Sequence, residues 1–170
     1  MALPDLRGER LALRPVTDRD VPSIATILSE PEVARWWGRY DRARVRREAL
    51  EDPAVEALVV EIDGEPGGVL YVNEERDADF RHVALDIALA ARFQGRGYGR
   101  EALRLVIDHL IAAHGHHRFT IDPEVGNEAA IRCYEAVGFR PVGVMRRYTR
   151  GLDGGWADGL LMDLLADELL

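Results

Sequence analysis

Apolar and polar side chains alternate along the chain in segments that predict a mixed sheet flanked by helices. The stretch from Arg10 to Val16 has the two-residue period of a strand. Two helical segments follow, at 17–29 and 41–51, and the first accommodates Pro22 only in its opening turn. The remaining segments are, in order, strands at 57–62, 68–73 and 82–89, a helix at 97–113, a strand at 119–122, a helix at 127–137, and strands at 142–148 and 159–165.

The order of these segments, βααβββαβαββ, indicates an α/β (α+β) fold with a mixed, mostly antiparallel sheet. Asp63-Gly64-Glu65-Pro66 joins two of the strands and has the composition of a hairpin turn. The longest predicted helix carries apolar side chains on one face, as a helix that packs on a sheet does. These side chains are Leu103, Val106, Ile107, Leu110 and Ile111.

Length and composition agree with a single domain over residues 1–170. Of the 170 residues, 47% are hydrophobic, which is enough to bury a sizeable core, and no apolar run approaches the length of a membrane span. The first residues, Met1 to Asp5, lack the pattern of a secretory signal, and the single Cys133 cannot form an internal disulfide. We therefore expect a cytoplasmic protein. Its net charge of −8 favours cationic partners and argues against nucleic acid.

The segment Gln94-Gly95-Arg96-Gly97-Tyr98-Gly99 lies between a predicted strand and a predicted helix. Its glycines let the backbone approach a ligand closely, and the free N–H groups at a helix start attract anions. No Lys-Ser or Lys-Thr pair follows, so this is not a Walker loop, and the glycines come too late for a dinucleotide-binding βαβ unit. The segment predicts a polyphosphate site, although a plain strand-to-helix turn stays open on this motif alone.

A second motif runs from Asn127 to Phe139, with apolar residues at helical spacing and Gly138 placed to end the helix. Together the two motifs resemble those of the GNAT superfamily of acyl-CoA-dependent N-acyltransferases. The first is similar to that family's Q/R-x-x-G-x-G/A pyrophosphate loop, and the second to its N-x-x-A-x-x-x-Y-x-x-x-G-F helix. Their order and separation fit as well, and the resemblance covers most of the chain.

The resemblance implies that acetyl-CoA is the cosubstrate and that no metal is needed. In such enzymes the loop amides and the following Arg hold the pyrophosphate, and the preceding strand edge pairs with the pantetheine amides and offers an N–H to the oxyanion. The family often has proline three residues before the loop's Gln, where this chain has Ala91. The residues that the resemblance assigns to the cofactor are Ile87, Leu89, Gln94, Gly95, Arg96, Gly97, Tyr98, Gly99, Arg100, Asn127 and Tyr134.

Two residues are candidates for the proton transfers. Tyr134 matches the family tyrosine, whose phenol donates a proton to the leaving thiolate, although a tyrosine at this spacing also suits a packed core. Asp86 interrupts an apolar strand and lies on the face opposite Leu85 and Ile87. It is the candidate base or the anchor of the attacking amine, and an exposed Asp on a one-sided sheet is the alternative.

The chain is also similar to the aminoglycoside 6′-N-acetyltransferases, in Trp36-Trp37-Gly38, the hairpin turn, the Leu85-Asp86 pair and the stretch from Asp122 to Tyr134. This similarity implies a small cationic amine as acceptor. An aromatic and acidic pocket suits a polycationic sugar. The connection at 74–81 is shorter than the tryptophan-bearing segment that this family often has. The residues that the similarity assigns to the acceptor are Trp36, Trp37, Asp86, Asp122 and, more weakly, Asp153.

Two other functions stay open at this point, namely a ribosomal-protein-type N-terminal acetyltransferase and a non-catalytic acyl-CoA-binding module. The former would have an open peptide groove, and the latter would bind the cofactor without turnover. His114, His116 and His117 have poor spacing for a metal and suit a helix C-terminus. The arginines between 35 and 47 suit a solvated helix face, with an arginine that reaches the cofactor phosphates as the minor alternative. The sequence leaves a monomer and a homodimer equally open.

Overall fold

Asp63 and Gly64 form the two-residue turn of the first hairpin. Their φ angles are +54° and +79°, a backbone that hairpin turns require and that Asp and Gly tolerate. The strands on either side, β3 (Val55–Ile62) and β4 (Glu65–Glu75), pair antiparallel. The predicted hairpin is therefore confirmed, but Glu65 and Pro66 belong to β4 rather than to the turn.

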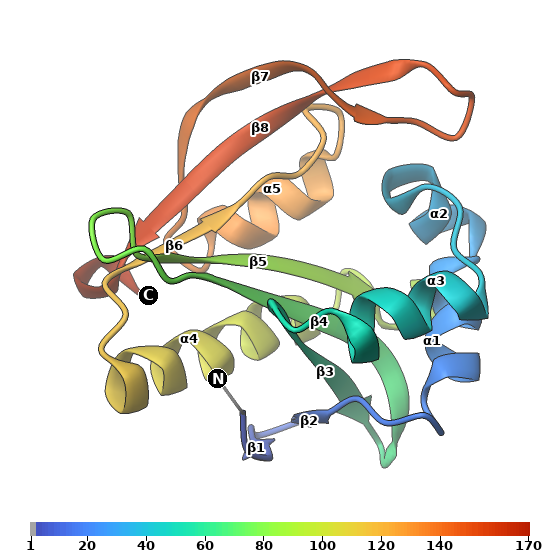
Figure 1. Cartoon of the computed structure of the whole chain (residues 1–170), viewed down its shortest axis with the longest axis horizontal. Helices are drawn as coiled ribbons and strands as arrows, with labels where there is room; N and C mark the ends of the chain where they lie inside the picture. Colours follow the sequence, from blue (N-terminus) through green and yellow to red (C-terminus); the bar gives the residue numbers. More distant parts are fainter. Residues whose placement is uncertain (1–2) are drawn as a thin grey trace.

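The computed structural model describes residues 3–170, and eight strands of this part form one sheet (Figure 1). The order across the sheet is β1-β2-β3-β4-β5-β6-β8-β7, and every neighbouring pair is antiparallel except β5 with β6. The mixed, mostly antiparallel sheet is thus confirmed. Met1 and Ala2, part of the segment in which we expect no secretory signal, lie outside the described residues. The other strands are β1 (Leu6–Arg7), β2 (Leu11–Pro15), β5 (His82–Leu89), β6 (Arg118–Ile121), β7 (Arg140–Arg150) and β8 (Trp156–Leu165).

The helices follow the predicted order, with one addition. They are α1 (Val21–Leu28), α2 (Pro31–Trp37), α3 (Arg42–Arg46), which continues as a π-helical stretch over Arg47–Glu51, α4 (Tyr98–His114) and α5 (Glu128–Glu135). Pro22 lies in the first turn of α1, as predicted. None of these helices, within residues 3–170, is long and apolar enough to cross a membrane.

Helix α2 is absent from the predicted order, in which Trp36 and Trp37 lie in the linker between the helical segments at 17–29 and 41–51. Pro31 is compatible with the first turn of a helix, because its missing N–H has no intrahelical acceptor there. Gly38, with φ +81°, ends the helix. A helix bounded by Pro and Gly therefore presents both tryptophans, which corrects the linker prediction. β1 is a further short strand outside the predicted order.

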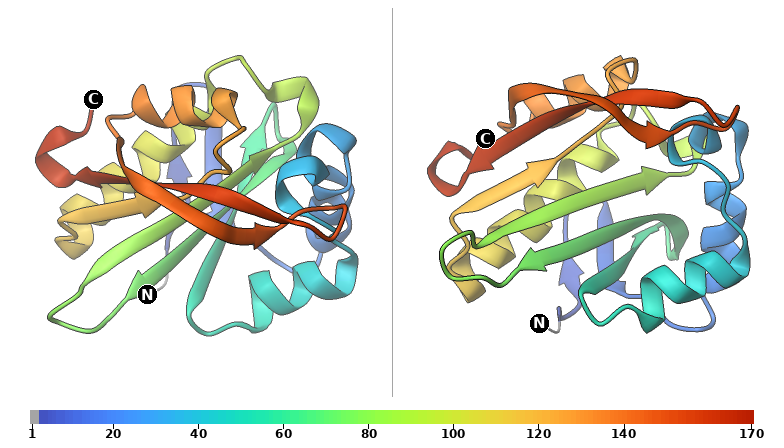
Figure 2. Two further views of the ribbon diagram at one scale, coloured as in Figure 1. Left: turned by 90° about the horizontal axis from the view of Figure 1, so that it is seen from above. Right: turned by 45° about the horizontal axis from the view of Figure 1, so that its top comes forward.

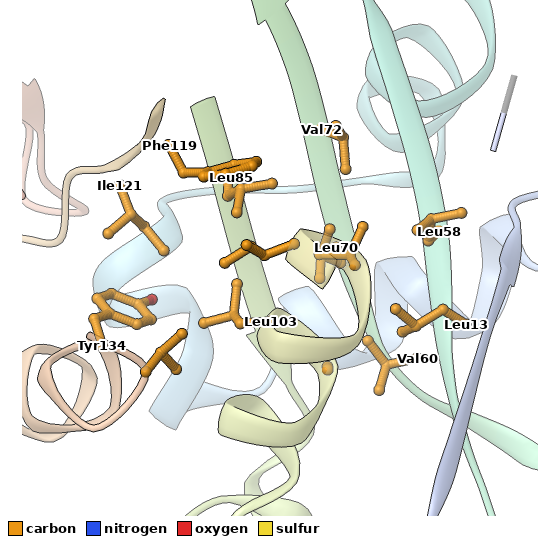
Figure 3. Close-up of a cluster of buried hydrophobic side chains, with 14 of the residues drawn as sticks. Leu13, Leu58, Val60, Leu70, Val72, Leu85, Leu103, Phe119, Ile121 and Tyr134 are labelled. Atoms are coloured by element: carbon orange, nitrogen blue, oxygen red, sulfur yellow. The ribbon is translucent and has the colours of Figure 1, made fainter. Parts of the chain in front are cut away.

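Two hydrophobic cores lie on the two faces of the sheet. One core lies against α4 and α5, and Figure 3 shows part of it, including Leu70, Leu85, Leu103 and Tyr134. The other lies against α1, α2 and α3 and includes Val69, Tyr71 and Ala88. Residues along β4 and β5 alternate between the two cores, as the two-residue period of a strand requires.

Strands β5 and β6 part soon after they meet. Their parallel pairing is limited to Val83 with Phe119 and Ala84 with Thr120. β5 runs on to Leu89 with β4 as its partner, while β6 ends at Ile121 and diverges from it (Figure 1). The second half of β5 therefore has one free edge, and the space beside that edge is where a ligand can reach backbone groups.

Candidate active site

A cleft of about 1150 Å³ opens where β5 and β6 part. Its walls come from α2, the end of β5, the glycine loop, the β6–α5 connection, α5 and β7. Arg96, Tyr98 and Asp153 are the predicted site residues that do not line it. The predicted site residues that line it are Trp36, Trp37, Asp86, Ile87, Leu89, Gln94, Gly95, Gly97, Gly99, Arg100, Asp122, Asn127 and Tyr134.

The glycine loop offers unpaired backbone N–H groups at the start of α4. Gly95 and Gly97 have φ angles of +71° and +86°, which only glycine adopts at little cost. Within the described chain, the amides of residues 95–100 donate no backbone hydrogen bond of standard geometry, whereas the Glu101 amide donates to the Gly97 carbonyl. The side-chain amide of Gln94 donates to the Leu89 carbonyl at 2.9 Å and so ties the loop to the end of β5. Amides in this position at a helix start suit an anion.

Arg10, which sequence reasoning missed, braces this loop from the start of β2. Its backbone N–H and Nε donate to the two carboxylate oxygens of Glu101 at 2.8 Å, and its Nη1 donates to the Arg96 carbonyl at 2.9 Å. Its guanidinium also lies 4.7 Å from the ring centre of Tyr98, whose other neighbour is Phe93. The side chain of Tyr98 is therefore structural. Because Arg10 neutralises Glu101, a carboxylate in the first turn of α4 does not repel an anion there.

Asp86 and Asp122 bring two carboxylates into the cleft from the two strands that part. Burial against the cleft walls, together with the charge of Asp122, raises the pKa of Asp86 to about 7, and a hydrogen bond from the Ile87 N–H partly offsets both effects. Water still reaches Asp86, because the cleft is open. Burial also raises the pKa of Asp122, although the Tyr148 hydroxyl donates to its Oδ2 at 2.7 Å.

Tyr134 stands on α5 with its ring at the edge of a core and its side chain against the cleft (Figure 3). The residue is only 6% exposed, and its ring packs edge-on against Phe139. Burial, together with the charge of Asp86, holds the pKa of the phenol well above its usual value. The packed-core interpretation of this tyrosine is confirmed, and because Tyr134 also lines the cleft its role as proton donor stays a prediction.

The two tryptophans of α2 form one wall of the cleft. The Trp37 ring lies 6.0 Å from the rings of both Tyr40 and Tyr71. The Trp36 ring packs against the β6–α5 connection, because a methyl group on Gly126 would lie 3.9 Å from two of its ring carbons. The wall thus reaches across to the opposite side of the cleft, and a ligand would enter between aromatic faces and carboxylates.

Two predicted residues have local structural partners. Asn127 accepts a hydrogen bond from the Ala130 N–H at 3.2 Å and caps α5, while its side chain also faces the cleft. Asp153 accepts from the Gly155 N–H at 2.8 Å and shapes the β7–β8 turn. Figure 2 shows the β7–β8 hairpin extending toward the helices at the start of the chain. The charge of Asp153 acts on Glu124, a residue of the cleft wall, so Asp153 lies near the cleft without lining it.

Sequence reasoning also missed several charged residues of the cleft. Arg35, Arg44 and Glu124 line it. Arg44 donates to Glu48 at 2.8 Å and lies over the ring of Tyr40. The only sequence signal for Glu124 is its place two residues after Asp122. The basic segment of 35–47 is therefore more than a solvated face, because two of its arginines enter the cleft.

Two histidines of the predicted cluster, His114 and His116, lie at and just after the end of α4. His114 ends α4, and the Gly115 that follows has the left-handed backbone of a helix end. His116 is 1% exposed, with Nε2 lying 3.2 Å from Glu74 Oε1. Residues 3–170 contain no group of three or more His, Cys, Asp or Glu side chains arranged to hold a metal ion.

Residues 10–140 match the acetyltransferase (GNAT) domain family. The chain belongs to this family. Its members transfer acetyl groups from acetyl-CoA, so the protein is an acetyl-CoA-dependent N-acetyltransferase. The glycine loop fits that cosubstrate, because its glycines and Arg100 line the cleft at the start of α4.

The curated relatives of this acetyltransferase differ in acceptor. It is 27% identical over 157 residues to the aminoglycoside N(6′)-acetyltransferase type 1 of Klebsiella pneumoniae, covering 81% of this chain and 78% of the relative. It is 36% identical over 75 residues to the N-alpha-acetyltransferase RimI of Mycobacterium tuberculosis, covering 44% of this chain and 45% of the relative. Among solved structures, AAC(6′)-Ib in complex with paromomycin and acetyl-CoA matches with a TM-score of 0.77 at 24% identity, over 94% of this chain and 96% of that one. The last match supports the shared fold.

Proposed function

We propose that the protein acetylates a primary amine of a small polycationic acceptor, with the 6′-amine of an aminoglycoside as the best candidate. The observation that carries the proposal is the pair of carboxylates, Asp86 and Asp122, in one cleft beside an aromatic wall. Carboxylates and aromatic faces both attract ammonium groups. We assign the whole chain, residues 1–170, to a single acyltransferase domain that carries this activity.

The proposed binding of acetyl-CoA rests on free backbone groups of the glycine loop and of the β5 edge. The amides of residues 95–100 and the Arg100 side chain are assigned to the pyrophosphate, because they are unpaired donors and a cation at a helix start. Arg96 and Tyr98 contribute through their amides, since their side chains lie outside the cleft wall. The free edge of β5 at Ile87 and Leu89, with Asn127 opposite, is assigned to the pantetheine arm. The Gln94 side chain already occupies the Leu89 carbonyl, so its chief role is to hold the loop.

The chemistry requires a base for the amine and an acid for the leaving thiolate. Asp86 is assigned as the base, acting directly or through a water molecule, because a pKa of about 7 leaves much of it ionised yet able to hold a proton. Tyr134 is assigned as the acid, because its raised pKa keeps the phenol protonated.

The acceptor assignment rests on the match to an aminoglycoside 6′-N-acetyltransferase over four fifths of the chain and on the acidic cleft. We assign Trp36 and Trp37 to ring contacts with the faces of the acceptor. Asp122 is assigned to an ion pair with one of its remote ammonium groups. Asp153 is assigned to the mouth, where it approaches only an extended acceptor. A multiply charged amino sugar has enough ammonium groups to use several of these contacts at once.

A panel of amines tests the proposal, with free thiol released from acetyl-CoA as the readout. Kanamycin- and tobramycin-like compounds should be turned over and acetylated on one amine, as mass spectrometry would show, and expression should raise resistance in a susceptible bacterium. Salt should raise the Michaelis constant for the acceptor, because the attraction is between partly exposed charges. Turnover of peptides with free N-termini, without any of aminoglycosides, would contradict the proposal and favour a protein N-terminal acetyltransferase.

A further inference from the structure

The guanidinium of Arg35 lies 4.5 Å from the ring centre of Trp36, and both residues line the cleft. Both are on α2, so a cation from the same helix already covers one face of an indole in the cleft wall. Among the described residues, no carboxylate lies within 4 Å of Arg35 to form an ion pair. The side chain is also exposed. A single cation–π contact therefore holds a charged side chain in place, and such a contact is weak at an exposed site.

Glu124 faces the same mouth from the opposite wall. It follows β6 and is fixed by backbone bridging to Gly159 of β8. Burial raises the pKa of Glu124, the nearby Arg35 partly offsets that effect, and Asp153 adds to it. Trp36 packs on Gly126, two residues further along the same connection, so the two walls are in contact at this point. Arg35 thus lies between an aromatic face and an acidic group without an ion pair to either wall.

This arrangement is the one that a substrate ammonium would take. An ammonium group binds best over the face of a tryptophan with a carboxylate nearby. We propose that Trp36 and Glu124 form a second cation subsite, that Arg35 occupies it in the free enzyme, and that a remote ammonium of the acceptor displaces Arg35 on binding. The proposal rests on the polycationic acceptor argued above and assigns Arg35 as a specificity-determining residue.

Displacement makes Arg35 an internal competitor of the acceptor. The presence of Arg35 weakens the binding of any acceptor that reaches the subsite. It does not change the binding of an amine with a single charge, because such an amine does not reach the subsite. The reacting amine lies at Asp86, so the chemical step itself is independent of Arg35. Removal of Arg35 should therefore change the Michaelis constant for multiply charged acceptors and leave kcat and the Michaelis constant for acetyl-CoA unchanged.

The test compares R35Q, R35K and the control R39Q, with tobramycin as the acceptor. R35Q should lower the Michaelis constant by about 3- to 10-fold, the combined effect of one exposed cation–π contact and one exposed charge pair. R35K keeps a cation and should stay near the wild type. R39Q removes the same charge from an exposed neighbour that does not line the cleft, so it reports the effect of net charge alone.

The dependence on Glu124 is measured in a double-mutant cycle. E124Q should raise the Michaelis constant for tobramycin, and the gain from R35Q should shrink to about 2-fold or less in the E124Q background. Equal effects of R35Q and R39Q, or full additivity of R35Q and E124Q, would overturn the subsite.

Calorimetric binding of tobramycin separates this inference from the proposed function. Binding without acetylation would contradict the proposed function, and the comparison of R35Q with R39Q would still decide the role of Arg35. Absence of binding to both the wild type and R35Q would overturn both proposals.

Discussion

The role of Asp86 leads to a sharp prediction about pH. With a pKa of about 7, roughly one-tenth of Asp86 is ionised at pH 6 and roughly nine-tenths at pH 8. An ordinary carboxylate, with a pKa of 3.8, would be fully ionised at both. If ionised Asp86 is the base, its contribution to kcat/KM should rise about tenfold between pH 6 and pH 8.

The acceptor amine also loses a proton in this range, so the measurement needs an internal reference. Asp86→Asn removes the base and leaves the amine unchanged, and the ratio of wild-type to variant kcat/KM cancels the titration of the acceptor. We expect this ratio to be about 100 at pH 8, within the range for a general base, and about 10 at pH 6. Asp108→Asn, an exposed substitution of the same kind on α4, should give a ratio of about 1 throughout.

Substitution of Asp122 provides a second test of the same pH prediction. Because the charge of Asp122 raises the pKa of Asp86, Asp122→Asn should move the acidic limb of the wild-type profile to lower pH. Thiol release at fixed ionic strength, with saturating acetyl-CoA, measures both arms. A ratio that stays flat between pH 6 and pH 8 would refute the assignment of Asp86 as a base that titrates near neutrality.

Two further predictions concern the cofactor loop and the proposed acid. Gly95→Asp should weaken acetyl-CoA binding by at least about tenfold in calorimetry, because it puts a carboxylate beside the phosphates. The control Gly64→Asp, at a similar φ and with equal free space around the glycine, should leave acetyl-CoA binding unchanged. Equal loss of binding in both variants would point to backbone strain instead. Tyr134→Phe should lower turnover by about 10- to 1000-fold with acetyl-CoA affinity within about twofold, and turnover within about twofold of the wild type would show that the thiolate leaves without this phenol.

The sheet and the cofactor loop are the features that the sequence predicts well, because they depend on local pattern. β5 has the predicted bounds of residues 82–89, since its alternation is strict and Ala90 and the loop end it. The glycine loop is predictable because positive φ angles and free amides follow from the glycines themselves. Helix α2 was missed although Pro31 and Gly38 mark its ends, because seven residues give too few turns for an apolar period to stand out.

The acceptor end of the cleft is predictable only in part, because contacts between distant elements form it. Asp86 and Asp122 are 36 positions apart and meet because β5 and β6 pair over two residues and then part. Arg10 reaches Glu101 across 91 positions, and no local pattern signals that brace. Glu124 and Arg35 enter the cleft from a turn and a short helix, and their residue types are ordinary for surface positions.

Asp86 and Asp122 differ in their hydrogen-bond donors, and this difference suits them to different roles. The Tyr148 hydroxyl donates to Asp122 and stabilises its charge, so Asp122 suits a lasting pair with an ammonium group. Asp86 receives a hydrogen bond from the Ile87 N–H and feels the charge of Asp122, which raises its pKa, so it is the carboxylate that more readily takes up a proton. In the function proposed above, a multiply charged acceptor would keep its remote ammonium on Asp122 while the reacting amine would give its proton to Asp86. An acceptor with one amine would have to choose between the two, which is a physical reason for this cleft to favour polyamines over monoamines.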